Sequence, residues 1–264
     1  MSFLGGMNMD ISNFINKGFS VEQLYQIRLG LQNGVDVLQY ADTRFNYVQM
    51  QEIRLGLQDN LDISKYAKTY FSGAQMKQIR EGLKAGIDLK TYASKKFSSA
   101  KIKEIKKGLL CKNNADKYAD RKFNAAQMKE IRDGEEIGVN VDVYAMPELS
   151  AEQMWQIKEG LRKGLHAQLY AKPSYTACQM QEIRLGLESR LSVNVYAESK
   201  YSAEQMHEIR LGLLENLNVG YYCNQYFSCE LMHELRDKLR KEKKAIKTND
   251  RDIIYSQQMF NFPA

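Results

Sequence analysis

The sequence predicts an all-α solenoid of stacked 26-residue repeats, with one long and one short helix in each repeat. The chain restates itself at a fixed period of 26 residues, without insertions. Within each period, apolar residues recur three or four positions apart, which is typical of a helix and not of a strand. The repeats open on an aromatic residue or a leucine, at Phe19, Phe45, Phe71, Phe97, Phe123, Leu149, Tyr175, Tyr201 and Phe227.

These openings divide the chain into four segments. Residues 10–18, "DISNFINKG", match the second half of a repeat, so residues 1–18 are predicted to form an N-terminal half-repeat or cap. Residues 19–226 hold eight full repeats. Residues 227–248 hold a partial ninth repeat and a charged capping helix, and residues 249–264 a C-terminal tail. A solenoid needs such polar caps, because its end repeats lack a neighbour on one side.

The long helix fills the first half of each repeat, whose positions we count from the opening residue. Positions 6, 9, 13 and 17 are apolar, as in Met50, Ile53, Leu57 and Leu61. A Ser, Asn or Thr at position 2 with a Gln at position 5 is typical of a capping box at the helix start. A Gly or Asn at position 16 indicates a left-handed residue that ends the helix after about 13 residues.

The short helix follows at position 18, where Asp, Asn or Ser provides an N-cap before the pattern V-x-x-Y-A. About six residues fit before the next repeat, enough for one or two turns, in part 3₁₀. A single repeat buries too little apolar surface to offset the conformational entropy of ordering its 26 residues. Neighbouring repeats must therefore cover each other.

Two further features recur in the long helix, a glycine and a basic residue. Position 12 is glycine in every complete repeat, and position 10 is always Arg or Lys. Because glycine weakens a helix interior, we expect close packing there: the Arg stem lies over the glycine of the next repeat, and its guanidinium reaches backbone carbonyls or a cap. The alternative is a ladder of cations for the phosphates of a nucleic acid. The frequent Glu at position 8 is expected on the solvated surface.

A partner-specific surface is expected where the repeats differ, on the outer face of the long helix. Position 11 is leucine near the two ends of the array and mostly charged between them. Apolar side chains directed away from the core indicate a protein-binding patch. The candidate protein-binding residues are Tyr25, Leu29, Leu55, Trp155, Leu185 and Leu211.

Charge is concentrated in the middle of the chain and suggests a second candidate surface. Residues 77–132 contain 16 Lys or Arg and 6 Asp or Glu, although the whole chain carries only +6. This basic block could bind the charged backbone of a nucleic acid or another polyanion, or it could be a solvated face. The polyanion-binding candidates are Lys95, Lys96, Lys103, Lys107, Lys117, Arg121 and Lys122.

Signals for chemistry are weak. The chain has no Gly-rich phosphate loop, no H-E-x-x-H and no nucleophile elbow, so we expect no enzyme, no cofactor and no small-molecule substrate. His207 and His233 occupy equivalent positions in adjacent repeats, but stacked helices place them awkwardly for one metal, and no metal site is predicted. The four cysteines lack paired spacing, and no signal or membrane-spanning segment is evident, so a cytoplasmic location is expected.

The stretch "QMQEIRLGLESRLSVNVYAESKYSAEQMHEIRLGL" resembles a 26-residue tandem repeat of bacterial proteins, often carried by phages and other mobile elements. Its pattern is F-S-x-x-Q-M-x-E-I-R-x-G-L-x-x-G-L-D-V-x-x-Y-A, and it covers residues 10–240. The resemblance implies no catalytic activity, and it makes inhibition of a host system, including a defence system, an expected role. This chain departs from the pattern at Glu135, where a leucine is expected, and at Lys101, Asn113 and Ala115. The sequence therefore predicts a non-catalytic scaffold for a protein partner, with polyanion binding as the alternative.

Overall fold

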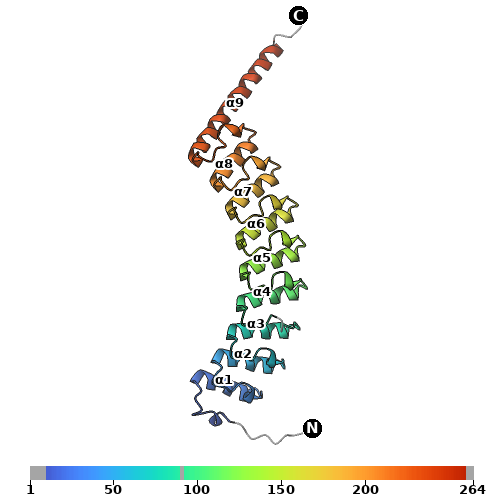
Figure 1. Cartoon of the computed structure of the whole chain (residues 1–264), viewed down its shortest axis with the longest axis vertical. Helices are drawn as coiled ribbons and strands as arrows, with labels where there is room; N and C mark the ends of the chain where they lie inside the picture. Colours follow the sequence, from blue (N-terminus) through green and yellow to red (C-terminus); the bar gives the residue numbers. More distant parts are fainter. Residues whose placement is uncertain (1–9, 90–91, 260–264) are drawn as a thin grey trace. The chain divides into compact units, whose positions relative to one another are not determined.

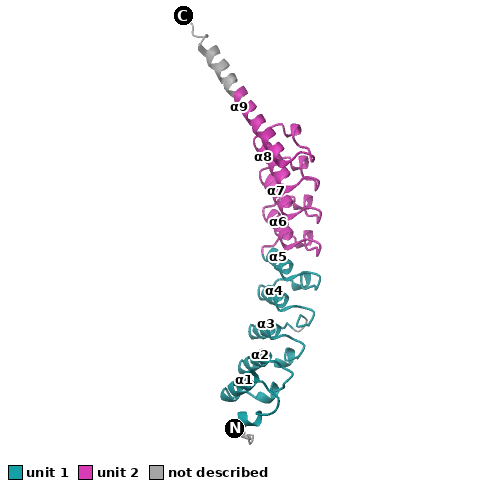
Figure 2. Cartoon of the chain, turned by 90° about the vertical axis from the view of Figure 1, so that its left-hand side faces the viewer, with its two compact units in different colours: residues 1–136 teal, residues 137–264 magenta. Residues whose placement is uncertain are grey.

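The structure, a computed structural model, describes residues 10–89 and 92–259, with side chains as far as residue 246. The chain divides into two units, Met1–Glu136 and Ile137–Ala264, and each is described by itself (Figure 2). Throughout the described residues, all regular elements are α-helices or 3₁₀ turns. Successive helices pack against one another along each unit (Figure 1), so the predicted all-α solenoid is confirmed.

The first unit contains the first five long helices and the 3₁₀ turns that accompany them. Its elements are η1 (Ile11–Asn13), α1 (Val21–Gln32), η2 (Val37–Gln39), α2 (Tyr47–Gln58), η3 (Ile63–Lys65), α3 (Gly73–Lys84), α4 (Ser99–Leu110), η4 (Ala115–Lys117) and α5 (Ala125–Glu136). The second unit contains η5 (Val141–Val143), α6 (Ala151–Arg162), η6 (Ala167–Leu169), α7 (Ala177–Glu188), η7 (Val193–Val195), α8 (Ala203–Leu214), η8 (Val219–Tyr221) and α9 (Cys229–Met259).

The long helices of the full repeats stop as predicted, and outside α4 they also start as predicted. In α7, the Thr176 side chain accepts from the backbone N–H of Gln179, and the Gln179 side chain accepts from the backbone of Thr176, which completes a capping box. Position 16 has a positive φ in the repeats, including 59° at Lys112 and 56° at Arg190, where neither Gly nor Asn is present. The second helix is shorter than expected, a 3₁₀ turn of three residues.

A tyrosine at position 22 fills the core between the long helix and the 3₁₀ turn of its own repeat. In α7 and η7, the buried Tyr196 hydroxyl donates to the backbone carbonyl of Glu182 at 3.1 Å. A Cβ on Gly186 would overlap that hydroxyl. The position 12 glycine thus makes room for the tyrosine of the same repeat. The prediction that an arginine from another repeat fills the glycine site is wrong, because the tyrosine hydroxyl is the group nearest to Gly186.

The position 10 side chain instead pairs with position 8 of the preceding helix. Arg210 Nε lies 2.6 Å from a Glu182 carboxylate oxygen, and Arg184 Nε donates to the Gln156 side chain at 2.9 Å. These arginines are buried, and so is Glu182 at 8% exposure. The expectation that position 8 is solvated holds only for Glu234 in α9 and is wrong for the preceding helices, where its carboxylates and amides are internal partners of the arginines. The recurring basic residues thereby join repeats to one another.

A glutamine at position 5 links each helix start to the next repeat. The Gln179 amide donates to the backbone carbonyls of Ser199 at 3.3 Å and Tyr201 at 2.6 Å, while its oxygen serves the capping box of α7. The side chain therefore bonds with all its polar atoms and is buried. In α4, where Lys101 replaces the glutamine, its Nζ still donates to the carbonyl of Arg121 at 2.8 Å.

The other departures from the repeat pattern are also accommodated. Glu135 occupies a partly exposed position and lies 3.3 Å from Lys117. Asn113 donates to the carbonyl of Arg132 at 3.3 Å, and Ala115 is buried. Repeat 3 differs more, because the Tyr92 hydroxyl donates outward to Asp116 and Leu89 takes the place beside Gly82.

Each end of the array is capped. At the N-terminal end, η1 brings Phe14 to 5% exposure against α1, as predicted for a half-repeat. At the other end, Arg240 of α9 binds Glu215 at 2.6 Å, and Lys243 donates to the carbonyl of Asn216 at 2.7 Å. The helix continues to Met259, so the predicted tail begins inside it, and residues 260–264 lie outside the described part. No helix in that part is long and apolar enough to cross a bilayer.

Candidate functional site

The outer faces of the long helices carry the side chains that vary between repeats, because positions 5, 8, 10, 12 and 22 are committed to internal contacts. Positions 3, 4, 7 and 11 face outward in most repeats, and the six predicted protein-binding residues all lie at positions 7 and 11. The structure divides those six between the two units. Tyr25, Leu29 and Leu55 lie in the first, and Trp155, Leu185 and Leu211 lie in the second.

The first unit has an apolar face on α1 and α2. Tyr25 is 47% exposed, with the Arg28 guanidinium 5.1 Å from its ring centroid, and Leu29 is half-buried one turn later. Val21, 79% exposed, precedes Tyr25 by four residues and so shares its side of the helix. We call Val21, Tyr25, Leu29, Tyr47 and Leu55 the α1–α2 face.

Sequence reasoning missed two members of this face, Val21 and Tyr47, both at position 3. Tyr47 is 47% exposed, whereas the same position is alanine in α5, α6, α7 and α8. That difference between repeats is visible in the sequence and could have identified them. Leu29 and Leu55 are less exposed than predicted, because each is half-buried between neighbouring side chains.

In the second unit, Trp155 has a contact of its own within the scaffold. The ring is 42% exposed, and the buried guanidinium of Arg184, from α7, lies 5.6 Å from its centroid. Trp155 therefore covers an internal cation and has a structural use besides its exposed edge. Leu185 and Leu211 are half-buried at the same position of α7 and α8.

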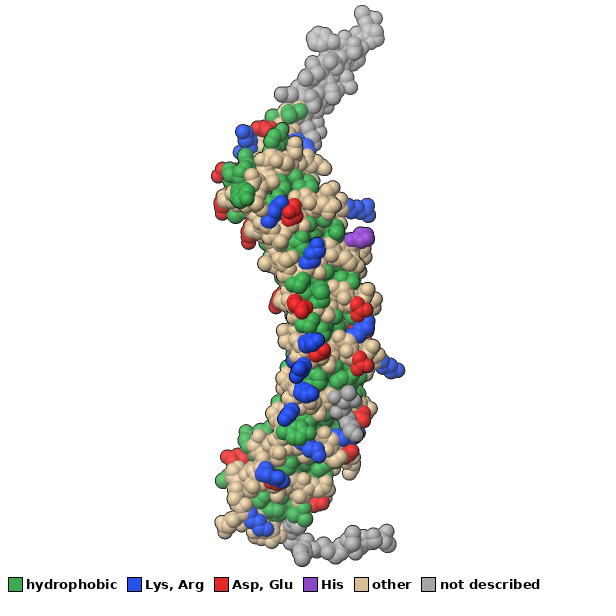
Figure 3. All heavy atoms as spheres, in the orientation of Figure 1, with side chains coloured by type: hydrophobic (Ala, Val, Ile, Leu, Met, Phe, Trp, Pro, Cys, Tyr) green, Lys and Arg blue, Asp and Glu red, His purple; other side chains and the backbone are tan. Residues whose placement is uncertain are grey.

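Part of the basic block is engaged in ion pairs. Lys107 is paired with Glu104 at 3.1 Å and Lys117 with Glu135 at 3.3 Å. Lys103 is exposed on α4, and no ion pair involves it within the described residues. Figure 3 shows Lys and Arg side chains gathered over α3 to α5 on one face. Among the predicted candidates outside helices, Lys95, Lys96, Arg121 and Lys122 are exposed and lack ion pairs within the described residues.

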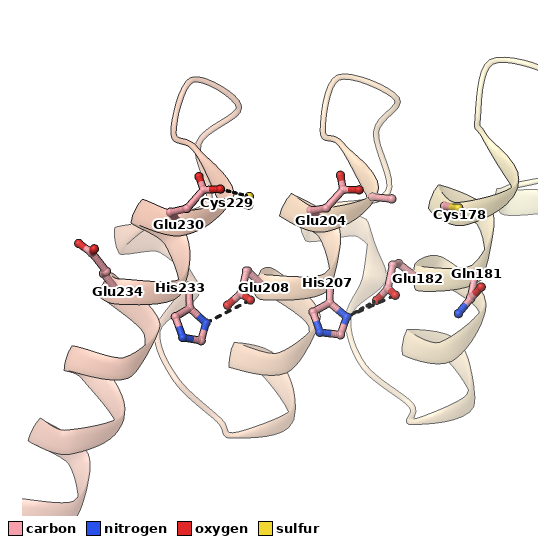
Figure 4. Close-up of a pocket in the computed structure, with 11 residues that line it drawn as sticks. Cys178, Gln181, Glu182, Glu204, His207, Glu208, Cys229, Glu230, His233 and Glu234 are labelled. Atoms are coloured by element: carbon pink, nitrogen blue, oxygen red, sulfur yellow. Dashed lines mark hydrogen bonds and ion pairs between the residues drawn. The ribbon is translucent and has the colours of Figure 1, made fainter.

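A hollow of about 610 Å³ opens on the outer faces of α7, α8 and α9, and sequence reasoning did not find it. Its lining includes small side chains at positions 3 and 4, namely Cys178, Ala203 and Cys229. Figure 4 shows a row of carboxylates near the helix starts, Glu204 and Glu230, and a second row of His–Glu pairs one turn further along. We call this the α7–α9 hollow.

The two His–Glu pairs repeat the same geometry on adjacent helices. His207 Nδ1 lies 3.3 Å from the Glu182 carboxylate and 3.2 Å from Arg210 Nη2. His233 Nδ1 lies 3.4 Å from Glu208. Arg210 donates to one Glu182 oxygen at 2.6 Å. The other Glu182 oxygen lies 3.4 Å from His207 Nδ1, which is a long contact, and faces the hollow.

The hollow is suited to electrostatic contacts and not to nucleophilic chemistry. The Cys229 thiol donates to Glu230 at 3.2 Å, and this hydrogen bond raises the pKa of the thiol, so the reactive thiolate is disfavoured. Hydrogen bonds from its own backbone N–H and, to a smaller extent, from the Ser202 side chain lower the pKa of Glu204. Among the described residues, no group of three or more His, Cys, Asp or Glu side chains could hold a metal ion.

Comparison with protein-family models, curated proteins and solved structures gave no match.

Proposed function

We propose that the chain is a non-catalytic repeat scaffold that binds a protein partner through the outer faces of its long helices. The resemblance to repeats of phages and mobile elements makes a bacterial host protein, including a component of a defence system, the partner class to test first. The observation that carries the proposal is the α1–α2 face, where Val21 is 79% exposed and Tyr25 and Tyr47 are each 47% exposed.

These side chains have the chemistry of a binding surface. Tyrosine supplies apolar area and a hydroxyl at low entropic cost, which is why it is enriched at the centres of protein interfaces. The scaffold does not need these side chains, because the same positions hold alanine, glutamine or lysine in other repeats that fold in the same way. A role outside the scaffold accounts for large apolar groups at these exposed sites.

Affinity capture from a bacterial lysate tests the proposal with the pair Tyr25→Asp and Tyr47→Asp. The expected result is that wild type retains a protein that this double variant loses. Tyr221→Asp with Tyr226→Asp is the matched control, because those tyrosines are 69% and 85% exposed but lie outside the outer face. Equal capture by wild type and by the Tyr25 and Tyr47 variant, with unchanged circular dichroism, would contradict the proposal.

A second candidate is polyanion binding through the exposed cations of the basic block. Lys95, Lys96, Arg121 and Lys122 lie at the ends of the third and fourth repeats without ion pairs in the described part of the chain, so they are free to contact phosphates. Retention on heparin should fall steeply with salt and should be lost when these four become alanine. Alanine at the paired Lys107 and Lys117 should change retention little. No retention at low salt rules out this candidate.

A further inference from the structure

The α7–α9 hollow combines an apolar floor with carboxylates that have no cation of their own. Glu204, Glu230 and Glu234 line it and are exposed, and within the described residues none of them pairs with a Lys or Arg. No Lys or Arg lines the hollow either. The deeper carboxylates, Glu182 and Glu208, are already balanced by Arg210 at 2.6 Å and Arg236 at 2.7 Å. The uncompensated charge of the hollow is therefore negative and lies at its rim.

The shape of the hollow follows from the repeat. Position 3 is Ala203 in α8 and Cys229 in α9, and position 4 is Cys178 in α7, so small side chains leave room between carboxylates from successive helices. The exposed His207 and His233 rings add flat surface along the second row (Figure 4). A long aliphatic stem can lie on such a floor while a cationic head reaches the rim.

We propose that the α7–α9 hollow binds an arginine-bearing segment of a protein partner. Guanidinium groups match this site best, because they form paired hydrogen bonds with carboxylates and stack on flat rings, which an ammonium group does less well. The free oxygens that face the hollow are acceptors, and arginine is a donor at all its polar atoms. The inference rests on the proposed role in protein binding and adds the chemistry of one contact.

The test measures binding of the full chain to a fluorescein-labelled peptide of alternating arginine and alanine, by fluorescence anisotropy. The expected result is saturable binding that Glu204→Gln with Glu230→Gln weakens by about tenfold. Glu22→Gln with Glu152→Gln is the matched control, because both hold position 4 behind the same serine cap but lie outside the hollow. Both double variants lose the same charge, so only a local contact can separate them.

A steric pair adds a readout that does not depend on charge. Ala203→Phe fills the hollow and should weaken peptide binding at least as much, whereas Ala151→Phe, at the same position of α6, should not. Equal effects of the two glutamine pairs, or unchanged binding by Ala203→Phe, would overturn the inference. Calorimetric binding of calcium that the Glu204 and Glu230 variant loses, without peptide binding, would also overturn it. If the peptide fails while capture through Tyr25 and Tyr47 persists, the proposed function stands without this contact.

Discussion

At the scale of single residues, the recurring glycine is explained by a side chain 10 residues later in the same repeat. The sequence correctly indicated a close approach at position 12, because glycine weakens a helix and must be offset. It could not indicate which group approaches, since a helical wheel relates positions within one helix and says nothing of a 3₁₀ turn that folds back. The tyrosine and the glycine are therefore one packing unit, seen at Gly186 and Tyr196.

This coupling predicts a non-additive pair of substitutions. Gly186→Ala should lower the free energy of unfolding by about 1–3 kcal/mol, because the new Cβ overlaps the Tyr196 hydroxyl. Tyr196→Phe should cost about 1 kcal/mol by removing the hydrogen bond to the Glu182 carbonyl. Since it also removes the clashing oxygen, the double variant should lose less than the sum of the two. Urea unfolding measures the cycle, and strict additivity would show that the two residues are not coupled.

At the scale of elements, the helices could be predicted and their connections could not. The apolar spacing, the capping boxes and the left-handed stop all follow from local chemistry, and the lengths of α1 to α8 agree with the prediction to within a residue or two. The α7–α9 hollow depends on how far side chains of three successive helices fill the space between them. The sequence shows small residues at Ala203 and Cys229, but only packed helices show that they leave a hollow.

The position 5 glutamine joins two elements and gives a graded prediction. Gln179→Ala removes the acceptor of the Thr176 cap and the donor to Tyr201, so it should cost about 2 kcal/mol. Gln179→Lys should cost less, because Lys101 at this position of α4 still donates to the carbonyl of Arg121. Thermal unfolding by circular dichroism ranks the variants, and equal losses for Ala and Lys would mean that the donor to the next repeat contributes nothing measurable.

At the scale of the whole molecule, the buried tyrosines of successive repeats should add up in their effect on stability. Burial raises the pKa of Tyr40 and of Tyr118 from 10.0 to about 12, and it also raises the pKa of four other position 22 tyrosines, namely Tyr66, Tyr170, Tyr196 and Tyr222. The folded chain therefore holds these phenolic protons more tightly than the unfolded chain. Stability should be unaffected below pH 10 and should fall steeply between about pH 10 and 12, as the unfolded chain alone ionises.

Alkaline titration followed by circular dichroism and tyrosinate absorbance checks this expectation. A difference of one in pKa between the folded and unfolded states corresponds to about 1.4 kcal/mol, so several buried tyrosines together should produce a cooperative loss of helix at the pH where tyrosinate appears. Full tyrosinate absorbance with the helices intact would contradict it.

Interchangeable repeats also predict which deletions the chain tolerates. Removal of residues 45–70 takes out one whole repeat and keeps the phase, so Gln23 would meet the carbonyl of residue 71 as it now meets that of Phe45 at 2.6 Å. Arg80 would likewise meet Gln26 as Arg54 does at 3.2 Å.

Removal of residues 45–57 deletes half as much but puts every later contact out of phase. We expect the larger deletion to keep its ellipticity per residue and a cooperative thermal transition, and the smaller deletion to lose both in the first unit, because stability in a solenoid comes from matched neighbours. If both deletions fold equally well, the contacts between successive repeats do not determine the fold.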